Sequence, residues 1–148
     1  MHIRALRLSR VWHPRPSVVA SVFGVIVLSV VAAGVFGYFV KKQVRANERA
    51  SALTGGDPKK GPSFIVQFGC AGCHQIPGIR GPAGKVGPPL ADVGARIYLG
   101  GRVLNTPQGL VEWIADPRKI DPKSAMPTTG ISHEEARDAA AYLLSLRR

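Results

Sequence analysis

The sequence contains few of the residues that ordinarily build metal centres. Its 148 residues include two cysteines, two methionines and four histidines. A structural zinc site usually takes about four Cys or His ligands, supplied as two pairs. An arginine-rich run with interleaved aromatic residues, which would indicate nucleic-acid binding, is also missing. The length leaves room for one small domain at most.

Charge is absent from residues 17–40, which read SVVASVFGVIVLSVVAAGVFGYFV and are followed by two lysines. At a rise of about 1.5 Å per residue, a helix of this length crosses a hydrocarbon core of about 30 Å. We therefore predict one transmembrane anchor helix. A cleaved signal peptide is the alternative, because the small residues Ala32, Ala33 and Gly34 leave room for cleavage. Its apolar region normally has about 7–15 residues, which favours the anchor.

Basic residues outnumber acidic ones, with 20 Lys and Arg against 9 Asp and Glu and a formal net charge of +11. Much of the excess lies beside the apolar segment, where basic side chains can contact the anionic headgroups of a lipid bilayer. Four flank it on each side: Arg4, Arg7, Arg10 and Arg15 before it, and Lys41, Lys42, Arg45 and Arg49 after it. The positive-inside rule therefore does not decide the orientation of the anchor.

Composition divides the chain into a basic N-terminus at 1–16, the anchor at 17–40, a stalk or linker at 41–60 and a globular domain at 61–148. In the domain, residues 77–89 are rich in Gly and Pro and predict a loop. Thr106-Pro107 predicts the start of one helix. The capping box Ser132-x-x-Glu135 predicts the start of the last one. No convincing alternating strand is present, so we predict an all-α domain.

Both cysteines lie in GCAGCHQIPG at residues 69–78, as Cys70-x-x-Cys73 followed directly by His74. For a zinc site the domain adds only the distant His133. A thioredoxin-like dithiol expects a βαβ context, which is missing, and leaves His74 unused. Covalent haem attachment uses all three residues, with two thioethers from the cysteines and His74 as an axial ligand of the iron. The motif therefore favours haem c.

A haem would also supply the core that a small, Gly/Pro-rich domain lacks. The predicted packing partners of the macrocycle are Phe68, Leu90, Leu104, Trp113 and Leu143.

The second axial ligand is predicted to be Met126, since the other methionine precedes the anchor. Met126 lies in SAMPT, an irregular segment of the kind that a ligand loop requires. A methionine that only fills a packing gap is one alternative. His133 is a rival ligand, but it stands in the first turn of an exposed helix. With both axial positions filled, the iron has no open site for substrate, so we expect electron transfer and not catalysis.

These features together resemble the class I c-type cytochromes over residues 57–148. The family order is helix, C-x-x-C-H, a Gly-Pro-x-Leu loop, a middle helix, a Met-Pro loop and a final helix, and GPPL occurs here at 87–90. The resemblance implies a small fold of about three to four helices around one covalent haem. It also implies that the first and last helices cross at a small residue, which Gly61 would supply against Tyr142.

The same resemblance assigns roles around the haem. In the family, the carbonyl of the loop proline, here Pro88, accepts a hydrogen bond from the proximal imidazole. A tryptophan of the middle helix often contacts a propionate, which makes Trp113 a candidate. Arg96 and Arg102 are candidates to pair with propionates.

More narrowly, LNTPQGLVEWIADPRKIDPKSAMP at 104–127 looks like the cytochrome c domain fused to subunit II of haem-copper oxidases. The partners implied are a haem-copper oxidase, a quinol-oxidising complex or a photosynthetic complex. We expect a single-electron carrier of a respiratory or photosynthetic chain. One alternative is a fixed subunit of a terminal oxidase, nitric oxide reductase or photosynthetic complex. Another is a haem sensor or peroxidase with an open sixth site.

The resemblance also orients the anchor, because the family's haem is attached on the outer face of the energy-coupling membrane. The haem domain would then lie on the periplasmic side of a bacterial inner membrane, with residues 1–16 in the cytoplasm.

Overall fold

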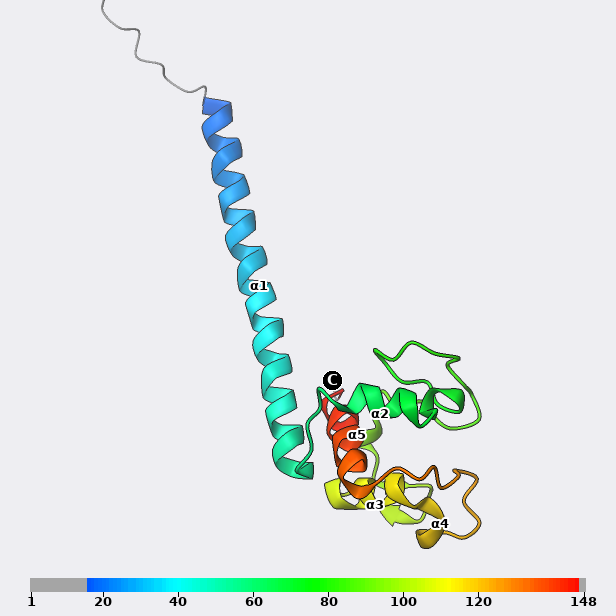
Figure 1. Cartoon of the computed structure of the whole chain (residues 1–148). Coiled ribbons are helices and arrows are strands. Elements are labelled where there is room, and N and C mark those ends of the chain that lie inside the picture. Colours follow the sequence, from blue (N-terminus) through cyan, green and yellow to red (C-terminus); the bar gives the residue numbers. More distant parts are fainter. Residues whose placement is uncertain (1–15, 147–148) are drawn as a thin grey trace, which may run out of the picture. The chain divides into compact units, whose positions relative to one another are not determined.

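The computed structural model describes residues 16–146, so the predicted cytoplasmic segment at 1–16 lies outside the described residues except for Pro16. Two compact units are present, divided between Phe39 and Val40. Helix α1, Pro16–Thr54, begins in the first unit and ends in the second. The predicted anchor and most of the predicted stalk therefore form one continuous helix (Figure 1).

The N-terminal part of α1 is apolar, and its side chains are exposed. Leu28 and Phe36 are 70% and 71% exposed. Within residues 16–146 this is the helix that is long and apolar enough to cross a membrane. Two of its serines are satisfied inside the helix, since the hydroxyl of Ser21 donates to the Ser17 carbonyl at 2.9 Å and that of Ser29 to the Val25 carbonyl at 2.8 Å. Such internal bonds remove the cost of a free hydroxyl in lipid.

The structure as a whole is mainly helical, as predicted, with 59% helix and 3% strand. The second unit contains the end of α1 and the shorter helices. Its helices are α2 (Gly61–Gln67), α3 (Pro107–Ala115), α4 (Pro117–Ile120) and α5 (His133–Ser145), with 3-10 turns at Cys70–Gly72 and Val93–Ala95. The sequence did not indicate the two-residue strands β1 (Tyr98–Leu99) and β2 (Val103–Leu104), which pair antiparallel with Tyr98 opposite Leu104. Strands of two residues are too short to show an alternating pattern.

Helix α5 is the centre of this unit, and both α2 and α3 pack against it (Figure 1). At the α2 crossing, a Cβ on Gly61 would lie 2.5 Å from the Asp138 carbonyl oxygen and 2.5 Å from the Tyr142 Cβ. Only glycine permits this approach, so the predicted crossing is confirmed. Pro62 stands in the first turn of α2, where its missing N–H costs nothing.

Side-chain caps define the helix ends that the sequence predicted. The Thr106 hydroxyl accepts a hydrogen bond from the Gly109 amide at 2.9 Å. Ser132 and Glu135 form the reciprocal capping box of α5. These caps place α3 and α5 at the residues where the motifs predicted them.

The end of α1 belongs to the second unit and is packed within it. Ala50 and Thr54 are 2% and 7% exposed. After the helix ends, the Asp57 amide donates to the carboxylate of Asp138 on α5 at 2.6 Å. A Cβ on Gly56 would lie 2.3 Å from the backbone of Arg137. Residues 50–57 are therefore part of the folded domain.

Candidate haem site

The Cys-x-x-Cys-His motif lies on a tight turn that directly follows α2. Gly69 has φ +68°, a left-handed conformation that glycine adopts without strain. The chain then forms one 3-10 turn, and the amides of Cys73 and His74 both donate to the Cys70 carbonyl, at 3.2 and 3.0 Å. This turn brings two thiols and one imidazole to the wall of a single cavity.

The cavity has a volume of about 440 Å³. Its lining includes seven of the residues that the sequence analysis assigned to the haem: Cys70, Cys73, His74, Pro88, Arg96, Trp113 and Met126. Much of the remaining surface is apolar and comes from α2, α3, α5 and the loops between them, with Ile65, Phe68, Leu90, Leu110, Ile114 and Leu143 among the lining residues. Residues far apart in sequence thus form one apolar chamber that contains the predicted attachment and ligand residues.

The imidazole of His74 has a defined orientation. Its Nδ1 lies 2.8 Å from the carbonyl oxygen of Pro88. A carbonyl only accepts, so Nδ1 carries the proton and Nε2 keeps the lone pair that a metal ligand needs. The approach depends on Gly87, because a Cβ there would lie 2.2 Å from His74 Cε1. The loop at 87–90 therefore sets both the position and the tautomer of the imidazole.

Met126 lies in an irregular loop between α4 and α5 and is half-buried at the cavity. Its amide donates to the Ser124 hydroxyl at 3.2 Å, and the Lys123 amide donates to Asp121 at 3.0 Å. The rival His133 is not among the residues that line the cavity. Its side chain is 60% exposed and lies 3.9 Å from the Glu112 carboxylate.

The remaining predicted contacts divide into those near the cavity and those away from it. Trp113 packs against Gly100, where a Cβ would lie 2.6 Å from the indole. Arg96 lines the cavity and donates to the Pro89 carbonyl. Arg102 instead pairs with Asp121 at 3.6 Å. The prediction that Leu104 packs on the macrocycle was wrong, since Leu104 is 57% exposed and does not line the cavity.

Comparison with known families agrees with this geometry. The family model described as Cytochrome c matches residues 58–147, which is more than half of the chain. The chain belongs to the cytochrome c family. Neither the comparison with curated proteins nor the one with solved structures found a match. Membership implies covalently bound haem c and a role as an electron carrier. The narrower likeness to the oxidase-fused domain stays a prediction.

The donor set of this cytochrome fits haem c. Cys70 and Cys73 are free thiols and both are half-buried. Burial raises the pKa of the Cys70 thiol, and the neighbouring Cys73 adds to that effect. Cys70 and Cys73 would hold the haem as thioethers, each thiol supplying its sulfur and its hydrogen to one vinyl group. The apolar chamber beside these thiols suits a porphyrin.

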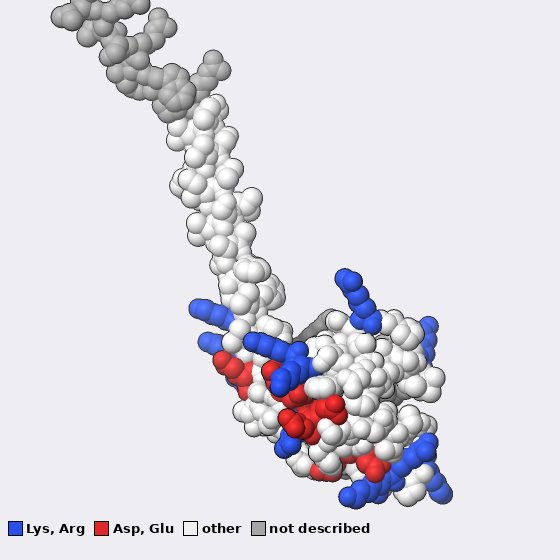
Figure 2. All heavy atoms as spheres, viewed as in Figure 1, with Lys and Arg blue, Asp and Glu red and all other residues white. Residues whose placement is uncertain are grey.

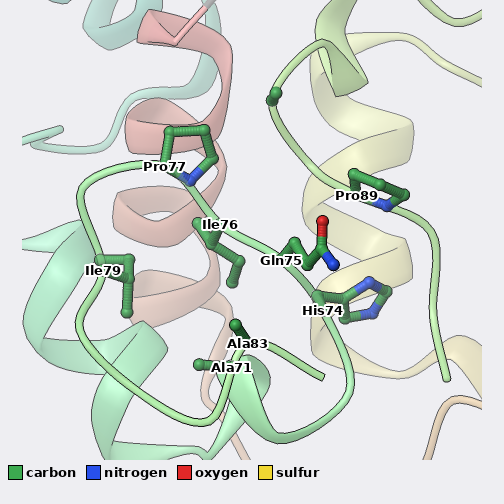
Figure 3. A pocket seen from close by; sticks show the side chains of 9 residues that line it. Ala71, His74, Gln75, Ile76, Pro77, Ile79, Ala83 and Pro89 are labelled. Carbon is green, nitrogen blue, oxygen red and sulfur yellow. The ribbon is translucent and has the colours of Figure 1, made fainter. Parts of the chain in front are cut away.

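A smaller hollow of about 320 Å³ lies beside the Gly/Pro-rich loop at residues 77–89 of the cytochrome (Figure 3). Mostly apolar residues line it, including Ala71, Ile76, Pro77, Ile79 and Ala83. His74 lines both this hollow and the large cavity. Apart from His74, the polar side chain that lines this hollow is the amide of Gln75. We therefore assign no second set of iron ligands to the hollow.

Several cavity residues of the cytochrome were not singled out from the sequence. Gly87 and Gly100 admit the His74 and Trp113 rings. Gly87 could have been found, since it is the first residue of the GPPL motif. Gly100 has φ +55° and lies in the Gly100-Gly101 turn between β1 and β2, a turn that becomes evident only from the pairing of the two strands. Asp116 and Thr128 do not line the cavity, but the Thr128 hydroxyl donates to the Asp116 carboxylate at 2.8 Å, and no local motif indicates this contact.

Proposed function

We propose that this cytochrome is a membrane-anchored monohaem carrier, ligated by His74 and Met126, that transfers single electrons in a respiratory or photosynthetic chain. The observation that carries the proposal is the shared cavity. His74 and Met126 are 52 positions apart in the sequence, and both line the chamber that Cys70 and Cys73 border. When bound, the haem iron supplies the one-electron chemistry.

The residues of the chain have distinct tasks in this proposal. Cys70 and Cys73 would tether the haem, and His74 would offer Nε2 to the iron while the Pro88 carbonyl holds Nδ1. Met126 would close the sixth position, so that neither water nor substrate binds there. A thioether ligand favours the ferrous state and raises the potential. Apolar side chains of α2, α3 and α5 line the chamber, and with the haem bound they would keep water away from it and so lower the reorganisation energy of electron transfer.

Helix α1 supports the proposed anchoring by its length and its exposed apolar surface. We place the haem domain on the periplasmic side of a bacterial inner membrane, since the family's haem is attached outside. The partners would be acidic surfaces of a haem-copper oxidase, a quinol-oxidising complex or a photosynthetic complex. Arg96 and Lys123 line the cavity, and Figure 2 shows further Lys and Arg side chains at several edges of the domain. Docking of this kind is weak and sensitive to salt.

A fixed subunit of a larger redox complex is the second candidate, and one observation favours it. Residues 50–57 are packed on the domain through Ala50, Thr54 and the Asp57–Asp138 bond, so they do not act as a flexible linker. A carrier that shuttles between distant partners gains from a long linker. Co-purification in mild detergent separates the two candidates, because a free carrier is washed away from its partner.

The test of the ligand set is a redox-titrated visible spectrum of the full-length protein in detergent. A low-spin c-type spectrum with the far-red methionine-to-iron band is expected. Met126→Ala should lose that band and lower the potential, whereas the control His133→Ala should keep both. If Met126→Ala kept the band, methionine ligation would be wrong. If acid-acetone extraction removed the haem, covalent attachment would be wrong.

A further inference from the structure

Asp116 occupies the corner where α3 ends and α4 begins. It is the C-terminal cap residue of α3 and the N-cap of α4. Its Oδ1 accepts a hydrogen bond from the Lys119 amide at 3.2 Å. The same oxygen accepts a second bond from the Thr128 hydroxyl at 2.8 Å. One carboxylate oxygen therefore joins this corner to a residue two positions beyond Met126.

The contact joins the end of helix α3 to the loop that carries Met126, and both elements line the haem cavity. Helix α3 contributes Leu110, Trp113 and Ile114 to the lining. The loop contributes Met126, Pro127 and Thr129, while Thr128 is not a lining residue. The Thr128 side chain instead reaches Asp116. The contact thus holds the methionine loop to the helix that borders the same chamber.

The downstream half of the loop is held at its far end by Ile131, which is 6% exposed and belongs to the apolar core. In the described part of the chain, residues 125–131 take part in no hydrogen bond between two backbone groups. Upstream, Asp121 is held by Arg102 at 3.6 Å, but Arg102 is 65% exposed. The bond from the Met126 amide to Ser124 is local and does not tie the loop to another element. Between Met126 and the buried Ile131, the bond from Thr128 to Asp116 is the one hydrogen bond in the described part of the chain that ties the loop to another element.

We propose that Asp116 is a positioning residue for the sixth iron ligand. Through Thr128, its carboxylate holds the loop so that the Met126 sulfur stays at the iron and external ligands are kept out. This inference rests on the proposed His/Met ligation. Without the contact, the loop opens more often, and a ligand such as imidazole competes better for the iron in proportion to the open population.

The experiment measures imidazole binding to the ferric full-length holoprotein in detergent, together with the far-red methionine-to-iron band. Thr128→Val removes only the hydroxyl and keeps the cap of α4. It should strengthen imidazole binding by roughly two- to tenfold, the range expected for one lost hydrogen bond. Asp116→Ala should give a similar increase. The double variant should add little to either single change, because both remove the same contact.

Two control variants separate positioning from general destabilisation. Asp92→Asn changes an exposed aspartate whose side chain makes no cap bond. Ser132→Ala weakens the cap of α5 and leaves the Thr128–Asp116 contact in place. Both should bind imidazole as the unmodified protein does.

The outcomes distinguish this inference from the proposed ligation. If Thr128→Val bound imidazole with unchanged affinity, or if Ser132→Ala strengthened it equally, the positioning role would be overturned. Ligation by Met126 would still hold in both cases, provided that the unmodified protein shows the band. If the unmodified protein had no such band, Met126 ligation would fail and the positioning role with it.

Discussion

Replacing Gly87 by alanine tests whether the GPPL loop orients the proximal imidazole. A methyl group there would lie 2.2 Å from His74 Cε1 and 2.5 Å from Nδ1, whereas ordinary contacts begin at 3.4 Å. Either the ring or the loop must therefore move by about 1 Å. A shift of this size breaks the 2.8 Å bond between Nδ1 and the Pro88 carbonyl.

The expected cost has two parts. Overpacking of a formed site costs about 1–3 kcal/mol. A lost hydrogen bond costs about 1 kcal/mol more. The sum is a large share of the ~5–15 kcal/mol by which small domains are stable. The lost bond also makes the imidazole a weaker donor, which should raise the potential.

The assay is guanidinium unfolding of the ferric holoprotein, with a redox titration of the same sample. Gly94→Ala is the matched control, because its new Cβ would meet only the flexible end of Leu144 at 3.0 Å. We expect Gly87→Ala to unfold at a clearly lower denaturant concentration than Gly94→Ala. Equal midpoints and equal potentials for the two variants would refute the assigned role of Gly87.

Two further predictions concern the helices around the cavity. Gly61→Ala should lower the free energy of unfolding by about 1–3 kcal/mol, because the new Cβ would lie 2.5 Å from Tyr142 Cβ on α5; a denaturation midpoint equal to that of the Gly94→Ala control would contradict this. Hydrogen bonds from the Ser132 amide and hydroxyl lower the pKa of Glu135. Glu135 therefore stabilises the fold above its unfolded pKa of about 4.3, and this contribution is lost as pH falls through its lower folded value. As the pH falls over that acid range, the melting temperature of Glu135→Gln should decrease less than that of the unmodified protein. Identical pH profiles for the two proteins would exclude the effect.

Local patterns were sufficient for the features that depend on neighbouring residues. The caps at Thr106 and Ser132 were predicted correctly because each uses a side chain within three residues of its partner. The Cys-x-x-Cys-His motif at Cys70 predicted one wall of the cavity correctly, because its three residues are also close neighbours in the sequence. The resemblance to a family supplied the contact between His74 and Pro88, and the structure contains it at 2.8 Å.

Contacts between distant residues could not be predicted in this way. Leu104 was predicted to pack on the haem, but the antiparallel pairing sets it opposite Tyr98, and both are exposed. The bond between Asp57 and Asp138 spans 81 positions, and that between Asp116 and Thr128 links residues with no shared motif. Such contacts depend on how the elements fold together, which no pattern within one element contains.

The packing of residues 50–57 determines where this chain can be cut. Composition alone would place the start of a soluble fragment near Gly61, after the predicted stalk. That cut would remove the buried Ala50 and Thr54 and leave the Asp138 carboxylate without the Asp57 amide. A fragment that begins at Val40 keeps these contacts and omits the apolar stretch. The last turns of α1 thus serve the folded domain, even though they are continuous with the predicted anchor.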